Sequence, residues 1–417
     1  MYAMKKILFS CLIFTTPLAA NAAGFALIEQ SASGMGNAFA GGGAVAEDAS
    51  TIYFNPAGMT YIEGTQLVGA LHLIKPNVEF NDNGSVKATG VPPLGGTGGD
   101  AGDLAFVPNA YFKMDYSETI KLGIGLNAPF GLKTEYDSTW AGRFQAIKSE
   151  FKTININPAL ALKVNDQLSI GAGISAMWAQ ATLSRAVNRV IAGENTVHIK
   201  GDDWGFGYNL GAIFQATPDS RISFAYRSKV NQQLEGDATF GDALAANNTT
   251  VKASIVLPET LSISAFSKMN DTWDVMGDVT WTHWSRFKEL RIDFANALPD
   301  SVTTENWDNT MRYSIGANYH YSDTIKLRAG LAYDEEAISD EFRTARIPGN
   351  DRKWISVGAN WKLTENSFMD VGYSHLFISS ASINDNQSAP AKGRNGILKG
   401  SYNGRVDILS LQYTHNF

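Results

Sequence analysis

The sequence predicts an all-β fold, a transmembrane antiparallel β-barrel of about 14 strands with a small N-terminal hatch inside its lumen. Three observations lead to this prediction: an export signal at the N-terminus, alternation of large apolar with small or polar residues, and connections that are short and long in turn. Because lipid offers no hydrogen bonds to an open strand edge, a sheet that spans a membrane has to close on itself.

The N-terminus predicts secretion. Residues 1–22 contain two lysines, an apolar run and then small residues before the expected cleavage, which are the parts of a signal peptide. The apolar run is shorter than the roughly 20 residues that a membrane helix needs. The single cysteine, Cys11, lies within this signal, so the exported chain that starts at Ala23 has no disulfide. Its stability therefore has to come from a large core or a closed hydrogen-bonded sheet.

Alternation dominates residues 65–417, which we expect to form the barrel. From Ile355 to Leu363 the sequence reads ISVGANWKL, with large or apolar residues at every second position and small or polar residues between them. Residues 152–164 and 312–321 follow the same period of two. Two unlike faces suit an antiparallel sheet that separates two different environments.

The connections between these segments predict two different ends of a barrel. Every second connection is short, such as 165–167 and 322–324, whereas the others are long, such as 81–103 and 384–403. This arrangement describes an outer-membrane barrel. Aromatic residues gather at segment ends, as a membrane interface favours, and the chain ends on Phe417. A soluble secreted β-sandwich or propeller is the alternative, but the chain has no blade-length repeat.

Composition and motifs argue against several classes of function. The formal net charge of −7 is the opposite of the basic footprint that nucleic-acid binding requires. The histidines show no H-E-x-x-H spacing, and no G-x-S-x-G occurs. We therefore expect no enzyme, no catalytic residues, no metal and no cofactor.

Residues 23–64 do not alternate and are rich in glycine and alanine, including three consecutive glycines at 41–43. A barrel of about 14 strands leaves a lumen. Small residues let a compact segment fold back into that lumen as a hatch, because its backbone can approach the inner wall. A disordered tail is the alternative, but a tail has no use for Phe25, Phe39 and Phe54.

The hatch segment carries a resemblance to a known family. Residues 24–60, GFALIEQSASGMGNAFAGGGAVAEDASTIYFNPAGMT, resemble the N-terminal hatch of the FadL family, and the similarity continues through 108–113 (PNAYFK) and 123–132 (GIGLNAPFGL). The resemblance implies uptake of long-chain fatty acids across the outer membrane of a Gram-negative bacterium, with neutral aromatic or aliphatic hydrocarbons as the alternative cargo. It also implies contact with outer-membrane lipid and lipopolysaccharide. We expect a monomer.

Lateral release through a kinked third strand is the mechanism that the family implies. Here Pro129 cannot donate to a ladder and glycines surround it, so Asn127 and Pro129 mark the candidate kink. By the same resemblance, Asn55, Pro56 and Ala57 of the hatch are expected to contact the kink as a gate. The alternative is that Pro129 only ends the strand at a loop.

The resemblance places the ligand contacts of the family at the N-terminus that signal cleavage would create and at one arginine. Ala23, Gly24 and Phe25 would lie beside the bound ligand, and Arg185 would face its carboxylate, with Arg189 as the competitor. A cation is needed because a carboxylate in an apolar pocket requires a charged partner. The second basic contact of the family has no match in the sequence around 307–309, which leaves room for a neutral hydrocarbon.

Apolar residues in the connection after the third segment are candidates for capturing ligand from outside. They are Phe130, Leu132, Trp140 and Phe144. Packing against one another to close the mouth of the barrel is the rival explanation. A general diffusion porin or an adhesin is the rival class of protein, and the hatch argues against both because neither needs one.

Overall fold

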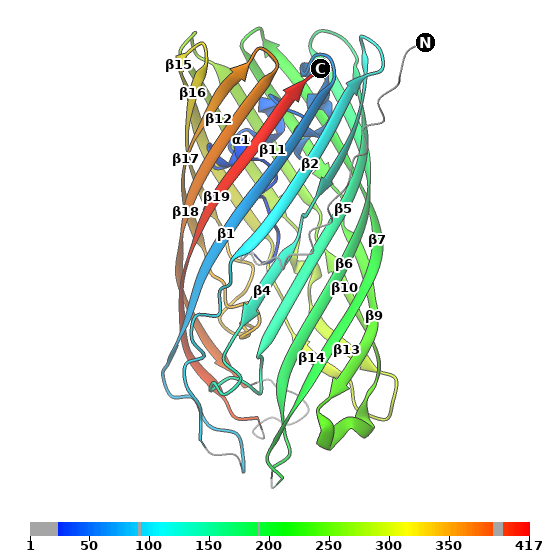
Figure 1. Cartoon of the computed structure of the whole chain (residues 1–417), viewed down its shortest axis with the longest axis vertical. Coiled ribbons are helices and arrows are strands. Elements are labelled where there is room, and N and C mark those ends of the chain that lie inside the picture. The colour runs from blue at the N-terminus through cyan, green and yellow to red at the C-terminus, as the bar shows by residue number, and fades with distance from the viewer. Residues whose placement is uncertain (1–23, 91–92, 191, 387–394) are drawn as a thin grey trace, which may run out of the picture.

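The computed structural model describes residues 24–90, 93–190, 192–386 and 395–417. The expected signal peptide and Ala23 lie outside the described residues. Within them, strands form one antiparallel sheet that closes on itself, because β19 (Leu398–Asn416) pairs with β1 (Gln66–Asp82). The expected fold class, a closed barrel of 14 antiparallel strands, is confirmed (Figure 1).

The remaining strand segments, in chain order, are β2 (Ala105–Asp115), β3 (Ile120–Asn127), β4 (Gly131–Glu135), β5 (Lys148–Lys163), β6 (Leu168–Asn188), β7 (Glu194–Thr217), β8 (Ser220–Arg227), β9 (Val230–Phe240), β10 (Thr249–Leu257), β11 (Thr260–Lys268), β12 (Trp273–Thr282), β13 (Glu289–Phe294), β14 (Ser301–Thr304), β15 (Thr310–Ser322), β16 (Ile325–Asp334), β17 (Arg352–Thr364) and β18 (Ser367–Asp385). Five successive pairs each make up one interrupted barrel strand: β3 with β4, β8 with β9, β10 with β11, β12 with β13, and β14 with β15.

Burial follows the alternation of the sequence. In β17, Ile355 and Val357 are about half exposed, whereas Trp354 and Ser356 between them are buried. Large apolar side chains therefore face outward to lipid, and the lumen takes the smaller and polar ones together with residues that touch the hatch. Among the described residues, no helix has the length and apolar character needed to cross a membrane.

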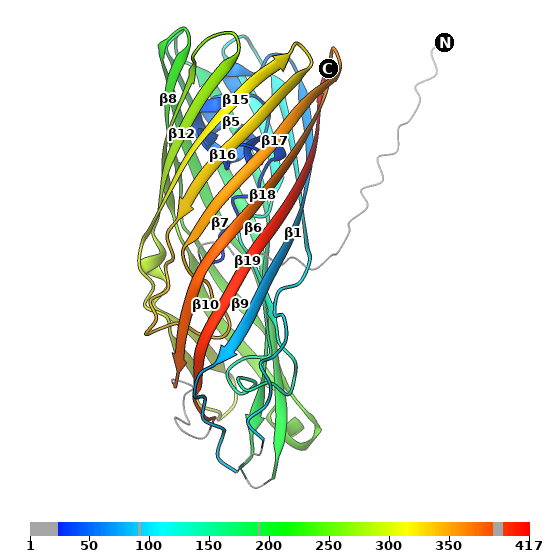
Figure 2. The same cartoon turned by 90° about the vertical axis from the view of Figure 1, so that its left-hand side faces the viewer.

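The N-terminal segment lies inside the barrel, nearer to the end with the short turns than to the end with the long loops (Figures 1 and 2). It consists of short helices, α1 (Ala32–Met35), α2 (Gly42–Val45), α3 (Thr51–Phe54) and the 3-10 helix η1 (Pro56–Tyr61). Two further 3-10 helices, η2 (Asp242–Asn247) and η3 (Trp284–Arg286), lie between strand segments of the wall.

Glycines of the wall allow this segment to pack closely. A Cβ added to Gly211 would lie 1.8 Å from Asn55 Oδ1, and one added to Gly171 would lie 2.4 Å from the amide nitrogen of Ala57. By contrast, a Cβ on Gly69 would meet nothing within 4 Å. Wall glycines thus let the backbone of the hatch approach the strands, as expected from the absence of a side chain.

Ion pairs also hold the hatch to the opposite wall. The carboxylate of Glu47 lies 2.6 Å from both Lys326 Nζ and Arg328 Nη1 on β16. Arg328 also contacts Asp370 on β18 at 2.8 Å, and both of these side chains are buried. These charges are compensated by one another, which a low-dielectric interior requires.

Candidate functional site

The ladder between β2 and the third barrel strand stops halfway along the wall. The last pair is Ala110 with Leu126, and β4 pairs only with β5 on its other side. Continuing the same register would place Pro108 opposite Ala128 and Pro129 opposite Val107. Because proline has no backbone N–H, two prolines in facing strands remove the donors that the next rungs would use. We call residues 105–109 and 127–130 the ladder interruption.

The first described residues of the hatch take the place of the missing strand. The amide of Leu27 donates to the carbonyl of Pro129 at 2.8 Å, and the amide of Gly131 donates to the carbonyl of Phe25 at 2.9 Å. On the other border, Asn109 Nδ2 of β2 donates to the carbonyl of Glu29 at 2.9 Å. Residues 25–30 therefore bond to both borders of the ladder interruption and close it from inside.

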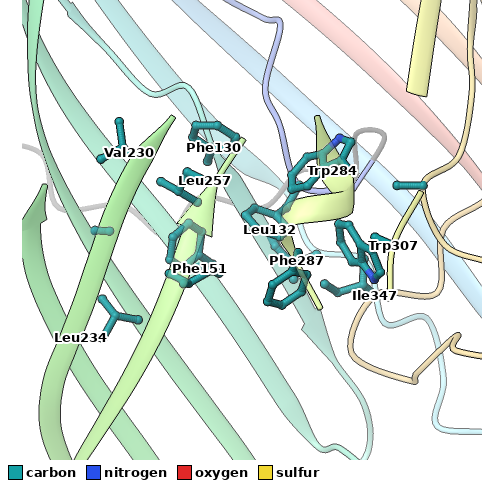
Figure 3. Packing of buried hydrophobic residues seen from close by; sticks show 14 of the residues in the cluster. Phe130, Leu132, Phe151, Val230, Leu234, Leu257, Trp284, Phe287, Trp307 and Ile347 are labelled. Carbon is teal, nitrogen blue, oxygen red and sulfur yellow. The ribbon is translucent and has the colours of Figure 1, made fainter. Parts of the chain in front are cut away.

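An aromatic group surrounds Phe25 behind this closure. The ring of Phe25 lies 4.8 Å from Trp284, 5.4 Å from Phe151 and 5.7 Å from Trp307, measured between centroids. Phe130 and Phe287 complete the group, in which tilted and edge-on contacts prevail (Figure 3). We call these six residues the seal cluster: Phe25, Phe130, Phe151, Trp284, Phe287 and Trp307.

A mostly apolar cavity adjoins the seal cluster. We call it the deep cavity. Phe25 and Phe151 line it, together with aliphatic residues of β4, β6, β9 and β10. Its polar lining comes from Ser149, Glu150, Glu305 and Arg346. An apolar chamber with a few convergent polar groups is the usual form of a small-molecule site.

A second hollow lies next to the deep cavity towards the long loops, and the two share Leu183, Leu290 and Arg346 as lining residues. We call it the outer hollow. Arg185 lines it beside Phe144. Within the described residues, no hydrogen bond or ion pair joins the Arg185 guanidinium to another group. Arg185 is half-buried and shares the outer hollow with Arg346 and with one acid, Asp385. A guanidinium that no hydrogen bond occupies can bind an anionic ligand.

Arg346 comes from the connection between β16 and β17 and is held in place by backbone and side-chain oxygens. Its Nη1 donates to Ser149 Oγ at 2.9 Å, and its Nη2 donates to the carbonyl of Gln145 at 3.1 Å. Burial and the nearby charge of Arg185 together lower the pKa of Arg346 to about 10, against the opposing charges of Glu305 and Asp385. The guanidinium is still charged at neutral pH, so two cations, Arg185 and Arg346, line the outer hollow together with the acid Asp385.

The structure brings several of the expected ligand residues together. Phe25, Phe130 and Leu132 lie in one buried cluster, and Gly24 adjoins it, since a Cβ there would lie 2.6 Å from both Trp284 and Trp307. Arg185 and Phe144 line the outer hollow instead, and Arg189 lines neither space.

Trp140 departs from the expectation that it captures ligand. It is fully buried, stacks on Tyr136 at 3.9 Å and donates from Nε1 to the carbonyl of Ala146 at 2.7 Å. Its ring and its N–H are both satisfied within the loops, which favours the rival explanation over ligand capture for this residue. Trp140 packs against other loop residues at the mouth of the barrel, which is what the rival explanation predicts.

The expected gate contact between the Asn-Pro-Ala sequence and the kink is also corrected. Asn55 Nδ2 donates to the carbonyls of Gly43, Ala212 and Phe224. Asn55, Pro56 and Ala57 therefore pack against β6, β7 and β8, where wall glycines make room for them. Asn127 bonds instead to Asn155 of β5, whose Nδ2 donates to Asn127 Oδ1 at 3.0 Å.

Sequence reasoning missed the residues that close the ladder interruption and the second cation. Residues 25–30 read FALIEQ, and no alternation marks them as an extended segment. Trp284, Glu305 and Arg346 come from connections without periodicity, and no local pattern points to them. Among the described residues, no group of His, Cys, Asp or Glu has the arrangement of a metal site.

Comparison with known proteins gives a consistent picture. Residues 13–417 match the family model described as "Outer membrane protein transport protein (OMPP1/FadL/TodX)". Outer membrane protein P1 of Haemophilus influenzae is 32% identical, over 89% of this chain and 90% of that protein. The long-chain fatty acid transport protein of Escherichia coli O6:H1 is 28% identical, over 88% and 90%. A FadL homologue of Pseudomonas aeruginosa has the same fold, with a TM-score of 0.86 at 24% identity over 95% of this chain and 100% of that one.

Proposed function

The chain belongs to the OMPP1/FadL/TodX family of outer membrane transport proteins, and from this premise we propose that it takes up long-chain fatty acids. It is an outer-membrane protein, and its relatives are transporters rather than enzymes. The proposal has three steps: capture at the long-loop end, binding in the deep cavity, and lateral release through the ladder interruption.

The choice of a carboxylate cargo rests on one observation, the pair Arg185 and Arg346 beside mostly apolar chambers. Guanidinium groups bind carboxylates with short, charge-assisted hydrogen bonds. Burying two cations near each other is costly unless an anion joins them. A neutral hydrocarbon would leave the two cations with only the protein's own acids Asp385 and Glu305 nearby, whereas a fatty acid would add a carboxylate that can bond to them and would fill the apolar space with its chain.

The mostly apolar lining of the deep cavity supports binding of an alkyl chain. Burial of each CH₂ group contributes about 0.8 kcal/mol, so the chain supplies most of the affinity and the carboxylate supplies orientation. In this arrangement the head group lies towards Arg346 and the tail towards the seal cluster.

Lateral release is supported by the position of the ladder interruption next to the seal cluster. A fatty acid that left through a water-filled exit would lose about 0.8 kcal/mol per CH₂ group, whereas an exit through the wall keeps its chain in apolar surroundings. We propose that Phe25 and Leu27 move aside to let the ligand pass between β2 and β4. Residues 23–64 would act as the hatch, following removal of residues 1–22 as the signal peptide.

The proposal is tested by identifying what the purified protein carries. Mass spectrometry of lipids that co-purify with it is expected to find long-chain carboxylic acids, and an R185A/R346A variant is expected to retain fewer of them. A neutral aromatic hydrocarbon as the retained ligand would overturn the carboxylate assignment. A large, steady ion conductance of the wild-type protein would instead indicate a general diffusion porin.

A further inference from the structure

One buried acid in the deep cavity has no place in the mechanism so far. Glu305 lies between β14 and β15 and is only 3% exposed. Its Oε2 accepts a 2.9 Å hydrogen bond from Trp307 Nε1. Within the described residues, no salt bridge reaches its carboxyl group, although Arg346 lines the same cavity. A carboxyl that is buried without a cation in contact is costly in its ionised form.

The surroundings of Glu305 determine its charge. Burial raises the pKa of Glu305 to about 8, which the hydrogen bond from Trp307 and the charge of Arg346 only partly offset, whereas Asp385 adds to the rise. Glu150 is the other acid that lines the deep cavity. At neutral pH most molecules therefore hold Glu305 as the neutral acid, which is a hydrogen-bond donor as well as an acceptor.

We propose that protonated Glu305 donates a hydrogen bond to the carboxylate of the ligand, beside Arg346, and so selects ionised fatty acids over neutral hydrocarbons. This inference rests on the proposed function and assigns the head-group end of the deep cavity. Glu305 supplies the O–H, and the ligand carboxylate accepts it without transfer of the proton. Such O–H to carboxylate bonds are short and about twice as strong as neutral ones.

The same arrangement predicts that ionised Glu305 repels the ligand. Once Glu305 loses its proton, two carboxylates would face each other in a poorly solvated chamber with one guanidinium between them, and like charges at such range are strongly unfavourable. An alcohol of the same chain length lacks this repulsion, because its hydroxyl can donate to the ionised Glu305. The acid and the alcohol are thus a matched pair of probes.

The experiment measures binding of a twelve-carbon fatty acid and of the matching alcohol to the purified protein at pH 7 and pH 9. For a group with a pKa of about 8, the protonated fraction falls about tenfold between these pH values. The affinity of the wild-type protein for the acid is expected to fall by about that factor, while that for the alcohol stays within about twofold. In E305Q the affinity for the acid is expected to be nearly the same at both pH values, since an amide donates but does not ionise.

Two further variants make the test specific. E336Q changes another acid whose side chain is only 4% exposed and which lines neither space, and it is expected to keep the wild-type pH dependence. W307F removes the hydrogen bond that stabilises ionised Glu305, so the loss of affinity is expected to shift to higher pH. The assignment would be overturned if E305Q lost as much affinity for the fatty acid between pH 7 and pH 9 as the wild type does. It would also be overturned if the wild type lost none. Absence of binding of both probes to the wild type at pH 7 would contradict the proposed function itself, and this inference with it.

Discussion

The amide of Leu27 donates a 2.8 Å hydrogen bond to the carbonyl of Pro129, which joins the hatch to the barrel strand at the point where that strand loses its neighbour. The hatch therefore closes the lumen and also replaces a missing piece of the wall. In the proposed mechanism, opening of the lateral path would therefore depend on the first described residues of the chain, rather than on the middle of the hatch.

Restoring the ladder should block release. The double variant P108V/P129V supplies two backbone N–H donors at the borders of the ladder interruption, and it is expected to reduce fatty-acid uptake by cells about tenfold or more. P158V is the control, because Pro158 faces outward on β5 and its neighbour β3 is fully paired there. Both variants are expected to show the gel mobility of a folded barrel. Normal uptake by folded P108V/P129V would argue against a lateral exit.

Crowding the wall glycines should displace the hatch. G211V would push against Asn55, and a side chain at Gly171 would collide with the backbone of Ala57. Either change is expected to give large conductance steps in planar bilayers that the wild-type protein lacks. G69V is the matched control on β1, because a Cβ there meets nothing within 4 Å, and it is expected to conduct like the wild type. Equal conductance in G211V and G69V would show that the hatch tolerates the collision.

Removing either cation should weaken binding of acids selectively. R185A and R346A each delete a charged hydrogen-bond donor, an interaction worth about 1.5–3 kcal/mol, so we expect roughly a tenfold to hundredfold loss in fatty-acid affinity. Affinity for a neutral hydrocarbon should change much less. R189A is the control, since Arg189 lines neither space. Titration with a fluorescent fatty acid measures all three, and an equal loss in R189A would contradict the assignment of Arg185.

Docking of the hatch should depend on pH through Glu29. Burial raises the pKa of Glu29 from its usual 4.5 to about 7, although Arg352 and Arg312 oppose this rise. The docked hatch thus binds the proton more tightly than the released one. Docking is expected to be strongest below pH 4.5 and to weaken as the pH rises to about 7, with no further change above. The frequency of large conductance steps at pH 5 and pH 8 measures this, and E29Q is expected to remove the difference.

The barrel was predictable because its signal is local and repeated. Alternation such as that from Ile355 to Leu363 reports a two-faced strand wherever it occurs, and the burial of β17 agrees with it. The hatch was predictable from small residues that cannot alternate. Which wall strands the hatch meets was not predictable, because the contact of Asn55 with β7 and β8 depends on the whole curvature of the barrel.

The binding site was predictable only in part. Phe25 and Arg185 were proposed through a family resemblance, and in the structure Phe25 lines the deep cavity and Arg185 lines the outer hollow. Arg346 and Glu305 lie in connections, where position is fixed by contacts between segments far apart in the chain rather than by periodicity. Arg346, for example, is held by oxygens near residue 148, almost 200 positions away.

The central claim is that the ligand leaves sideways through the ladder interruption, and photochemical labelling tests it most directly. A fatty acid with a light-activated diazirine at its terminal carbon would be added to cells that make the protein, and the labelled residues would be mapped by mass spectrometry. We predict labels on Phe106, Leu126 and Ala128, at the borders of the ladder interruption. Labels confined to Tyr61 and Glu63, at the short-turn end of the hatch, would show passage through the lumen and contradict the claim.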